Sequence, residues 1–264
     1  MRHSKRHAEI LSILRDEGTC GIADLAQRLG VSLETIRRDV KPLTQSGKIV
    51  KMHGAVTLPF RVAEAPFERR MRENADAKRA IAVACASRIK DGDSIMMDTG
   101  TTTSFLARQL LRRRDLTVVT NSSDVARTLA TVNGNKVFMA GGELRGDNGA
   151  AFGRSAIDFV ARFKVKFSII SIGAIGSATG PMDFDLDEAE FANVVLTCGE
   201  QAIIVSDHSK FGRQGLIKVC DYDTVDLLIT DEAPPADIAT TLRDADVEIE
   251  IAATPMSEQQ AASA

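Results

Sequence analysis

The feature of this sequence that most constrains its fold is an alternation, between residues 80 and 251, of short apolar segments with amphipathic ones. Short runs rich in Val and Ile are typical of buried strands, and the segments between them have the apolar spacing of helices. The alternation predicts a mostly parallel sheet covered by helices, because a helix usually connects two parallel strands. Strands are expected at residues 94–97, 116–119, 136–139, 167–172, 202–205, 227–229 and, as an edge strand with alternating polarity, 247–251.

The first 58 residues carry a different pattern, in which three short helical segments precede a stretch rich in β-branched residues. Gly18 and Gly30 follow the first two segments as stop signals, and Ser32 is placed to cap the third. A glycine within residues 48–57 offers a turn for a hairpin. Three helices followed by a hairpin are typical of a winged helix-turn-helix.

These patterns predict an α/β protein built from two unequal domains. A winged helix-turn-helix is expected over residues 1–58 and a linker over 59–77, where prolines and charges are frequent. The mostly parallel sheet domain is expected over residues 78–252, and a disordered tail over 253–264.

The third helical segment has the position of a recognition helix, whose N-terminal residues contact bases in the major groove. With Ile36 and Val40 facing the core, the neighbouring polar side chains face outward. An arginine there can pair with guanine or hold a phosphate, although an adjacent arginine pair is also common on a solvated helix face. The predicted DNA-binding residues are Ser32, Thr35, Arg37 and Arg38, together with Lys48, Lys51 and His53 of the wing.

Pro42 falls inside the same helical segment. An interior proline removes a hydrogen bond and clashes with the preceding turn. We therefore expect the recognition helix to bend or end after Val40.

The charge of the chain is divided unevenly between the two predicted domains. Residues 1–79 carry a net charge of +6, whereas residues 80–264 carry −9. A basic head on an acidic body is expected where only the head meets a polyanion such as DNA. Chance segregation of charge on a solvated surface is the alternative.

A threonine-rich segment directly follows the strand predicted at 94–97 and opens a helix. The backbone N–H groups of a helix N-terminus, next to a glycine and several hydroxyls, form a cradle for an anion such as phosphate. Helix capping alone also favours Thr and Ser, so the composition does not settle the point. The candidate residues here are Asp98, Gly100, Thr101, Thr102 and Thr103, and their spacing matches neither a Walker loop nor a dinucleotide fingerprint.

Further polar and glycine residues follow the other predicted strands. In open α/β sheets ligands bind outside the carboxyl ends of the strands, so these residues are expected to converge. Carboxylates at residues 183–188 could hold sugar hydroxyls, although an acidic helix start is also favoured by the helix dipole. The additional effector-site candidates are Asn121, Gly141, Gly142, Asp185, Glu188, Asp207 and Lys210.

At these residues the sequence resembles the DeoR-type family of transcriptional regulators. The resemblance lies in residues 35–39 and 48–55 of the head and in residues 98–103, 119–121, 140–144 and 207–212 of the body. It implies a body similar in fold to sugar-phosphate isomerases and coenzyme A transferases. It also implies a phosphate at the Gly100 to Thr103 loop, with Lys78 and Lys210 as cationic partners.

The function expected from these features is that of a repressor that binds double-stranded operator DNA and is released by a phosphorylated sugar or polyol, with glycerol 3-phosphate as one candidate. An isomerase-like enzyme with an accessory DNA-binding head is the alternative, and a regulator that answers to a protein partner is a third. We expect no catalytic residues, cofactor or metal, and a homo-oligomer, dimer or tetramer. Four widely spaced cysteines and the lack of a leader or an 18-residue apolar run favour a cytoplasmic protein without membrane contact.

Overall fold

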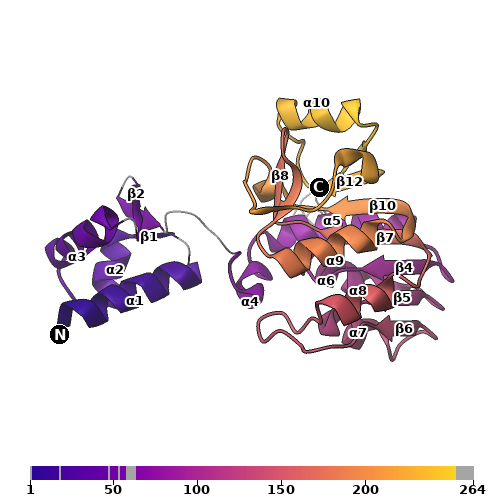
Figure 1. Cartoon of the computed structure of the whole chain (residues 1–264), viewed down its shortest axis with the longest axis horizontal. Coiled ribbons are helices and arrows are strands. Elements are labelled where there is room, and N and C mark those ends of the chain that lie inside the picture. The colour runs from indigo at the N-terminus through magenta and orange to yellow at the C-terminus, as the bar shows by residue number, and fades with distance from the viewer. Residues whose placement is uncertain (1, 18, 47, 53, 58–63, 254–264) are drawn as a thin grey trace, which may run out of the picture. The chain divides into compact units, whose positions relative to one another are not determined.

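The computed structural model describes residues 2–17, 19–46, 48–52, 54–57 and 64–253. The chain divides into two compact units, Met1–Pro66 and Phe67–Ala264 (Figure 1). The second unit begins at Phe67, so the structure places residues 67–77, which we assigned to the linker, within that unit. Ala253 apart, the expected tail lies outside the described residues.

The first unit is a winged helix-turn-helix, as the sequence predicts. Its helices α1 (Arg2–Glu17), α2 (Ile22–Arg28) and α3 (Leu33–Gln45) enclose a core that contains Ile10, Leu14, Leu25, Ile36 and Val40. The hairpin strands β2 (Val50–Met52) and β3 (Ala55–Thr57) are antiparallel, and Gly54 at the turn has a φ of +70°. Strand β1 (Thr19–Gly21) pairs with the outer side of β3, an interaction that the sequence did not indicate.

The proline in α3 does not end the helix, which was one of the two outcomes that we expected. Helix α3 continues from Leu33 to Gln45 with Pro42 on its exposed side. The turn after Val40 buries Leu43 in the core, and the Thr44 hydroxyl donates to the Val40 carbonyl at 3.0 Å. Solvent can satisfy the carbonyl that Pro42 leaves without a backbone donor, so burial of Leu43 outweighs the cost of the proline.

The second unit is organised around a seven-stranded sheet in the order β13-β12-β10-β7-β4-β5-β6, in which every pairing is parallel. The prediction of a mostly parallel sheet is therefore confirmed, with the last strand at an edge as expected. The strands are β4 (Ser94–Met97), β5 (Thr117–Thr120), β6 (Lys136–Met139), β7 (Val165–Ser171), β10 (Gly199–Val205), β12 (Leu227–Thr230) and β13 (Glu248–Ile251).

Apolar side chains cover both faces of this sheet. Ile203 and Val205 join one core cluster, whereas Ile204 between them joins the other. The first cluster packs under α5 (Ala75–Arg88), α6 (Thr101–Gln109) and α7 (Ser123–Leu129), and the second under α8 (Arg154–Val160), α9 (Leu186–Leu196) and α10 (Ala236–Asp244). Figure 1 shows α9 on the near side of the sheet and α5 on its far side. Burial on both faces explains why the strands read as continuous apolar runs.

Smaller elements complete the second unit. Short helix α4 (Phe67–Arg70) precedes α5, and the 3-10 helices η1 (Leu110–Arg112), η2 (His208–Lys210) and η3 (Tyr222–Thr224) lie in connections. A three-stranded antiparallel sheet, β11-β9-β8, was not expected and is formed by Ile217–Lys218, Gly180–Asp183 and Ala174–Gly176. Among the described residues, no helix has both the length and the apolar character that a membrane crossing requires.

Candidate functional sites

The N-terminal half of α3 and its cap present the predicted DNA-binding residues of this helix. Ser32 caps the helix by accepting a hydrogen bond from the Thr35 N–H at 3.2 Å, and the two hydroxyls are 2.9 Å apart. Arg37 and Arg38 are both exposed, and Arg37 lies 3.7 Å from Glu34 in a solvated pair with 62 % of its side chain accessible. The two guanidinium groups are therefore available to a partner molecule.

Two of the three predicted wing residues lie on the surface of the same unit. Lys48 lies three residues after the end of α3, and its N–H donates to the Leu43 carbonyl at 2.9 Å. Lys51 lies in β2 opposite Val56. Both lysine side chains are exposed. His53 lies outside the described residues.

Asp39 fixes the recognition helix from its buried side, a role that the sequence reading missed. Its side chain is 1 % exposed, and one carboxylate oxygen accepts from Arg6 Nε of α1 while the other lies 3.9 Å from His7 Nε2. The Asp39 carboxylate raises the pKa of Arg6 by accepting that hydrogen bond. The signal was present in the periodicity, because Asp39 shares the buried stripe of Ile36, Val40 and Leu43.

In the second unit, the predicted effector residues gather at the carboxyl ends of the strands. Met97 of β4 is paired with Thr120 of β5, so the next residues, Asp98 and Asn121, leave neighbouring strands side by side. Asp98 Oδ2 accepts hydrogen bonds from the N–H of Ser171 at 3.0 Å and from its hydroxyl at 3.3 Å. Burial raises the pKa of Asp98 to about 7, the negative charge of Glu188 adds to the rise, and the hydrogen bonds from Ser171 oppose it.

Several buried polar atoms at these strand ends have no hydrogen-bond partner within the described part of the chain. Such atoms are uncommon in folded proteins, and one explanation is a binding site for a polar molecule. They are Asp98 Oδ1, Thr99 Oγ1, Ser104 Oγ and Asn121 Oδ1.

The first turn of α6 lies against the same strand ends. Thr101 and Thr102 are buried there, and the helix geometry leaves their N–H groups without carbonyl partners inside the helix. The Thr103 hydroxyl, in contrast, donates to the carbonyls of Asp98 at 3.2 Å and Gly100 at 3.1 Å. The hydroxyl of Thr103 therefore stabilises the turn itself.

Close packing explains why a glycine occupies position 100, and the sequence did not suggest this. A Cβ atom at this position would lie 1.8 Å from Ser171 Oγ and 2.8 Å from Ser171 Cβ. We expected Gly100 to let the backbone approach a ligand, but its nearest constraint is β7. The glycine allows α6 to start close beside Ser171.

The segment after β6 crosses back over the end of β5, and we call residues 144–151 the strap. It starts beyond Gly141 and Gly142, which are both exposed. The strap forms bridges between Leu144 and Ala151 and between Ser122 and Ala150. Asn121 fixes it further, because its Nδ2 donates to the Ala151 carbonyl at 3.0 Å and its own carbonyl accepts from the Ala151 N–H at 3.0 Å.

Arg145 connects the strap to the acidic first turn of α9, and the sequence reading missed this residue. Its guanidinium lies 2.8 Å from Asp185, 2.7 Å from Asp187 and 3.4 Å from Glu188. Asp185 also caps α9 by accepting from the Glu188 N–H at 3.1 Å. Burial raises the pKa of Asp185, but the hydrogen bond and charge of Arg145 outweigh burial and lower it. Asn148 of the strap donates a hydrogen bond from Nδ2 to Glu188 Oε1 at 3.2 Å.

A second group forms around the carboxyl end of β10. Lys78 is buried, and its ammonium donates to the carbonyls of Arg70 and Glu73, the latter at 2.6 Å. Burial lowers the pKa of Lys78, which is also influenced by Asp207 and Lys210 nearby. Burial raises the pKa of Asp207, but hydrogen bonds from Ser209 and Asn74 and the charges of Lys210 and Lys78 lower it overall.

The structure thus brings Lys78, Asp207 and Lys210 together, and separately Asp98, Asn121, Glu188 and the α6 turn. Strand β7 lies between β10 and β4 in the sheet, so the two groups flank its end at Ser171. All of these predicted residues lie around the carboxyl ends of the strands, which is where ligands bind in open α/β sheets.

A possible metal-ligand group occurs beside the second of these clusters. His208, Asp231 and Glu232 each offer a ligand atom within 4.8 Å of the others. Two of them already form an ion pair, with His208 Nδ1 2.6 Å from Asp231 Oδ2, and the hydrogen bond from Asp231 raises the pKa of His208. That ion pair accounts for the arrangement without a metal.

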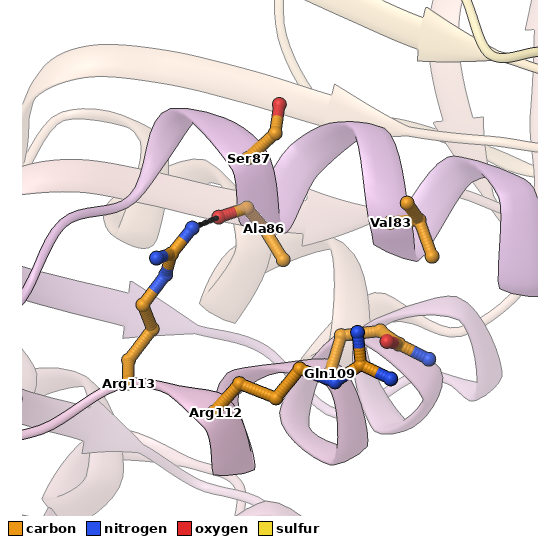
Figure 2. A pocket seen from close by; sticks show the side chains of 6 residues that line it. All are labelled: Val83, Ala86, Ser87, Gln109, Arg112 and Arg113. Atoms are coloured by element: carbon orange, nitrogen blue, oxygen red, sulfur yellow. Dashed lines mark hydrogen bonds between the residues drawn. The ribbon is translucent and has the colours of Figure 1, made fainter.

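Two surface hollows differ in their relation to these groups. One of about 450 Å³ opens beside Arg145 and is also lined by Phe152 and Asp187. The other, of about 310 Å³, lies between α5 and the end of α6, where Arg113 donates to the Ala86 carbonyl at 3.0 Å (Figure 2). Because α6 runs back from the carboxyl end of β4, its last residues lie toward the opposite edge of the sheet. None of the predicted effector residues lines either hollow.

Comparison with known proteins gives a consistent result for both units. Residues 6–61 match the DeoR-like helix-turn-helix domain, and residues 73–232 match the DeoR C terminal sensor domain. The chain is 31 % identical to the glycerol-3-phosphate regulon repressor of Escherichia coli K12, over 95 % of this chain and 100 % of that protein. The HTH-type transcriptional repressor CsqR of the same organism is 35 % identical, over 92 % of this chain and 94 % of its own length.

Among solved structures, ribose 5-phosphate isomerase A from Methanocaldococcus jannaschii is similar over 52 % of this chain and 55 % of that one, with a TM-score of 0.39 and 14 % sequence identity.

Proposed function

Because the chain belongs to the DeoR family of DNA-binding transcriptional regulators, we propose that it represses a sugar or polyol catabolic operon and leaves its operator when a phosphorylated sugar or polyol binds. The family expected from the sequence is confirmed. The chain is a regulator, and its relatives give no support to the alternative of an isomerase-like enzyme.

The observation that carries the DNA-binding role is the two-sided construction of α3. Its outer side exposes Arg37 and Arg38, and its inner side is held to α1 by buried Asp39. A helix fixed in this way can present side chains to base edges without losing their orientation. Lys48 and Lys51 add positive charge beside it, which suits contacts with phosphates.

The DNA-binding roles can be separated by their dependence on sequence and salt. An operator is first selected from a random duplex library, and affinities are then measured by fluorescence anisotropy. Arg38→Ala should lose about 1–3 kcal/mol on the selected operator and relax specificity at one base step. Lys48→Ala and Lys51→Ala should weaken all duplexes and each lower the salt slope by about one.

A control for this experiment is Arg127→Ala, which removes an exposed arginine of the second unit. It should leave the affinity for the operator unchanged. Equal loss on all duplexes after Arg38→Ala would assign Arg38 to phosphate contact instead of base recognition.

The effector role is supported by the two groups of residues at the carboxyl ends of the strands. The first turn of α6, with Thr101 and Thr102, and the cationic pair Lys78 and Lys210 suit a phosphate. The carboxylates of Asp98 and Glu188 and the amide of Asn121 suit hydroxyl groups. Glycerol 3-phosphate is the first ligand to test, because the name of one relative specifies it.

Calorimetry with phosphorylated sugars and polyols and with their unphosphorylated parents tests this role. Only the phosphorylated form should bind well, and Lys210→Ala should weaken it strongly without weakening operator binding. The control Lys90→Ala removes an exposed lysine elsewhere in the second unit. Equal binding of a parent compound would contradict a phosphate site.

We also propose that the protein acts in the cytoplasm as a homo-oligomer, because helix-turn-helix regulators usually present two copies to a two-fold operator. The second unit is the expected location of the contact. Sedimentation equilibrium of the full chain at micromolar concentration should show a dimer or tetramer, and a monomer would contradict the proposal.

A further inference from the structure

The seven-stranded sheet has two open edges, β6 and β13, because within the described part of the chain each of these strands pairs on one side only. Figure 1 shows β6 as the outermost strand on its side. The N–H groups of Lys136 and Ala140 donate to carbonyls of the β5 segment, both at 2.8 Å. Hydrogen-bonding groups alternate in direction along a strand, so the N–H and C=O groups of Val137 and Met139 point away from β5. These four groups can pair with a strand of another chain.

The side chains of β6 make the surface beside this open edge apolar. Phe138 is 40 % exposed, and the centre of its ring lies 5.1 Å from that of Phe163, which lies 5.3 Å from that of Phe159 in α8. Phe159 and Phe163 pack against the core on the α8 face of the sheet, so the three rings form an aromatic row that extends from this core to the edge. Lys136 is the only charged residue of the strand. Edge strands that stay unpaired usually carry more charge than this, or a proline or bulge.

Self-pairing of β6 has one antiparallel register that engages all the outward groups. In this register Val137 of each copy lies opposite Met139 of the other, where both residues exchange hydrogen bonds. The two-fold axis then passes through Phe138, and the two Phe138 side chains face each other on one side of the sheet. Aromatic pairs in this arrangement stabilise a sheet. The register also brings Lys136 of each copy to the carboxyl end of the other copy's strand, beyond which the exposed carboxylate of Glu143 lies three residues along the chain.

The same construction disfavours self-pairing at the β13 edge. The Glu248 N–H donates at 2.9 Å to the carbonyl just before β12, so Ile249 and Ile251 have their backbone groups outward and the axis would pass through Glu250. Two Glu250 carboxylates would then face each other, and like charges in this position destabilise a sheet. Glu248 and Glu250 lie 2.7 Å and 2.6 Å from Arg88, so charged side chains protect this edge.

We infer that two copies of this chain associate through β6, antiparallel across a two-fold axis at Phe138, so that their two sheets become one continuous sheet. The inference rests on the proposed homo-oligomer and names its contact. A second copy is the partner that fits, because the register matches the strand to itself and because a two-fold operator requires two helix-turn-helix units. In a tetramer this contact would build each dimer.

Disulfide trapping on the full chain tests the position of the axis. The four native cysteines are buried, so an introduced exposed cysteine is the one that reacts with a mild oxidant such as copper phenanthroline. Facing residues of a non-hydrogen-bonded pair have Cα atoms about 4.5 Å apart, which a disulfide can span. Phe138→Cys should therefore give a covalent dimer. Lys136→Cys is the matched control on the same face, because its counterpart would lie four residues away, about 13 Å along the strand, and beyond the reach of a disulfide.

Sedimentation equilibrium measures what the contact contributes to association. Phe138→Asp removes an aromatic pair and sets two carboxylates opposite each other, so it should raise the dissociation constant at least about tenfold. Leu216→Asp makes the same change at a side chain that is 65 % exposed elsewhere in the second unit and should leave the dissociation constant unchanged. Thermal unfolding of both variants checks that the second unit remains folded.

The outcomes separate this inference from the proposed homo-oligomer. If Phe138→Cys gives no covalent dimer, if Lys136→Cys gives one equally well, or if folded Phe138→Asp associates like the wild type, the β6 contact is wrong while the homo-oligomer stands. A covalent dimer of Glu250→Cys in place of Phe138→Cys would move the contact to β13. If the wild type sediments as a monomer, the homo-oligomer proposal fails and the inference fails with it.

Discussion

Substitution of Gly100 by alanine tests whether the close contact between α6 and β7 is the reason for this glycine. The φ of Gly100 is −168°, an extended conformation that any residue can adopt, so backbone strain is not expected. The added Cβ would lie 1.8 Å from Ser171 Oγ and 2.8 Å from Ser171 Cβ. The Ser171 side chain must then move, and its hydroxyl loses the contact with Asp98 Oδ2. Overpacking of this kind costs about 1–3 kcal/mol.

Urea unfolding of the second unit measures that cost as a loss in the free energy of unfolding. In thermal unfolding, each kcal/mol lost should lower the melting temperature by about 2–4 °C in a unit of this length. Gly146→Ala is the matched control, because a Cβ at Gly146 meets no atom within 4 Å and its φ is not positive. The control should be neutral or slightly stabilising.

A double-mutant cycle with Ser171→Gly identifies the contact itself. Ser171→Gly alone should destabilise by about 1 kcal/mol, because glycine is costly within a strand and the hydroxyl is lost. In the double variant both clashing atoms of residue 171 are absent, so the coupling energy should exceed about 1 kcal/mol. Effects that add within about 0.5 kcal/mol would refute the steric argument.

Three further predictions concern charged residues. Asp39→Ala should unfold or loosen the first unit, so operator binding measured by anisotropy should be lost while effector binding measured by calorimetry is kept. Asp24→Ala removes an exposed acidic residue as a control and should retain operator binding. Asp98 has a pKa of about 7 in the folded protein against 3.8 for the free group, so the folded state holds the extra proton and stability falls as pH rises from about 4 to 7, by at most about 1.4 kcal/mol per pH unit. Asp98→Asn should remove that fall, and an unchanged pH profile in urea unfolding would contradict the assignment. Arg145→Ala should destabilise the second unit by on the order of 1 kcal/mol, with a larger effect at low salt in thermal unfolding, because three carboxylates lose their shared cation; an effect independent of salt would argue against repulsion.

The parallel sheet could be predicted because its inner strands are buried on both faces. Segments such as Ala202 to Val205 then become continuous apolar runs, which stand out against the amphipathic helices. The winged unit was equally visible through Ser32, Gly30 and the helical spacing of its core. The small antiparallel sheet gave no such signal, since its strands are short and include Gly176, Gly180 and Pro181.

The sequence located the candidate sites better than it assigned roles within them. Strand ends are marked locally, so Asp98, Asn121 and Asp207 could be found from the segments they follow. The role of a residue depends on partners that are distant in the chain: Gly100 on Ser171, Arg145 on α9, and Asp39 on Arg6. No local pattern contains that information.

The order of strands in the large sheet has a consequence for how the chain is made. Strand β4 comes first, β5 and β6 add successively on one side of it, and β7, β10, β12 and β13 add successively on the other. During synthesis on the ribosome, every new strand therefore finds its partner already outside the exit tunnel. The sheet can grow first on one side and then on the other without waiting for a later segment. At each stage the strands already made are paired, and the next strand adds to an edge that is already formed.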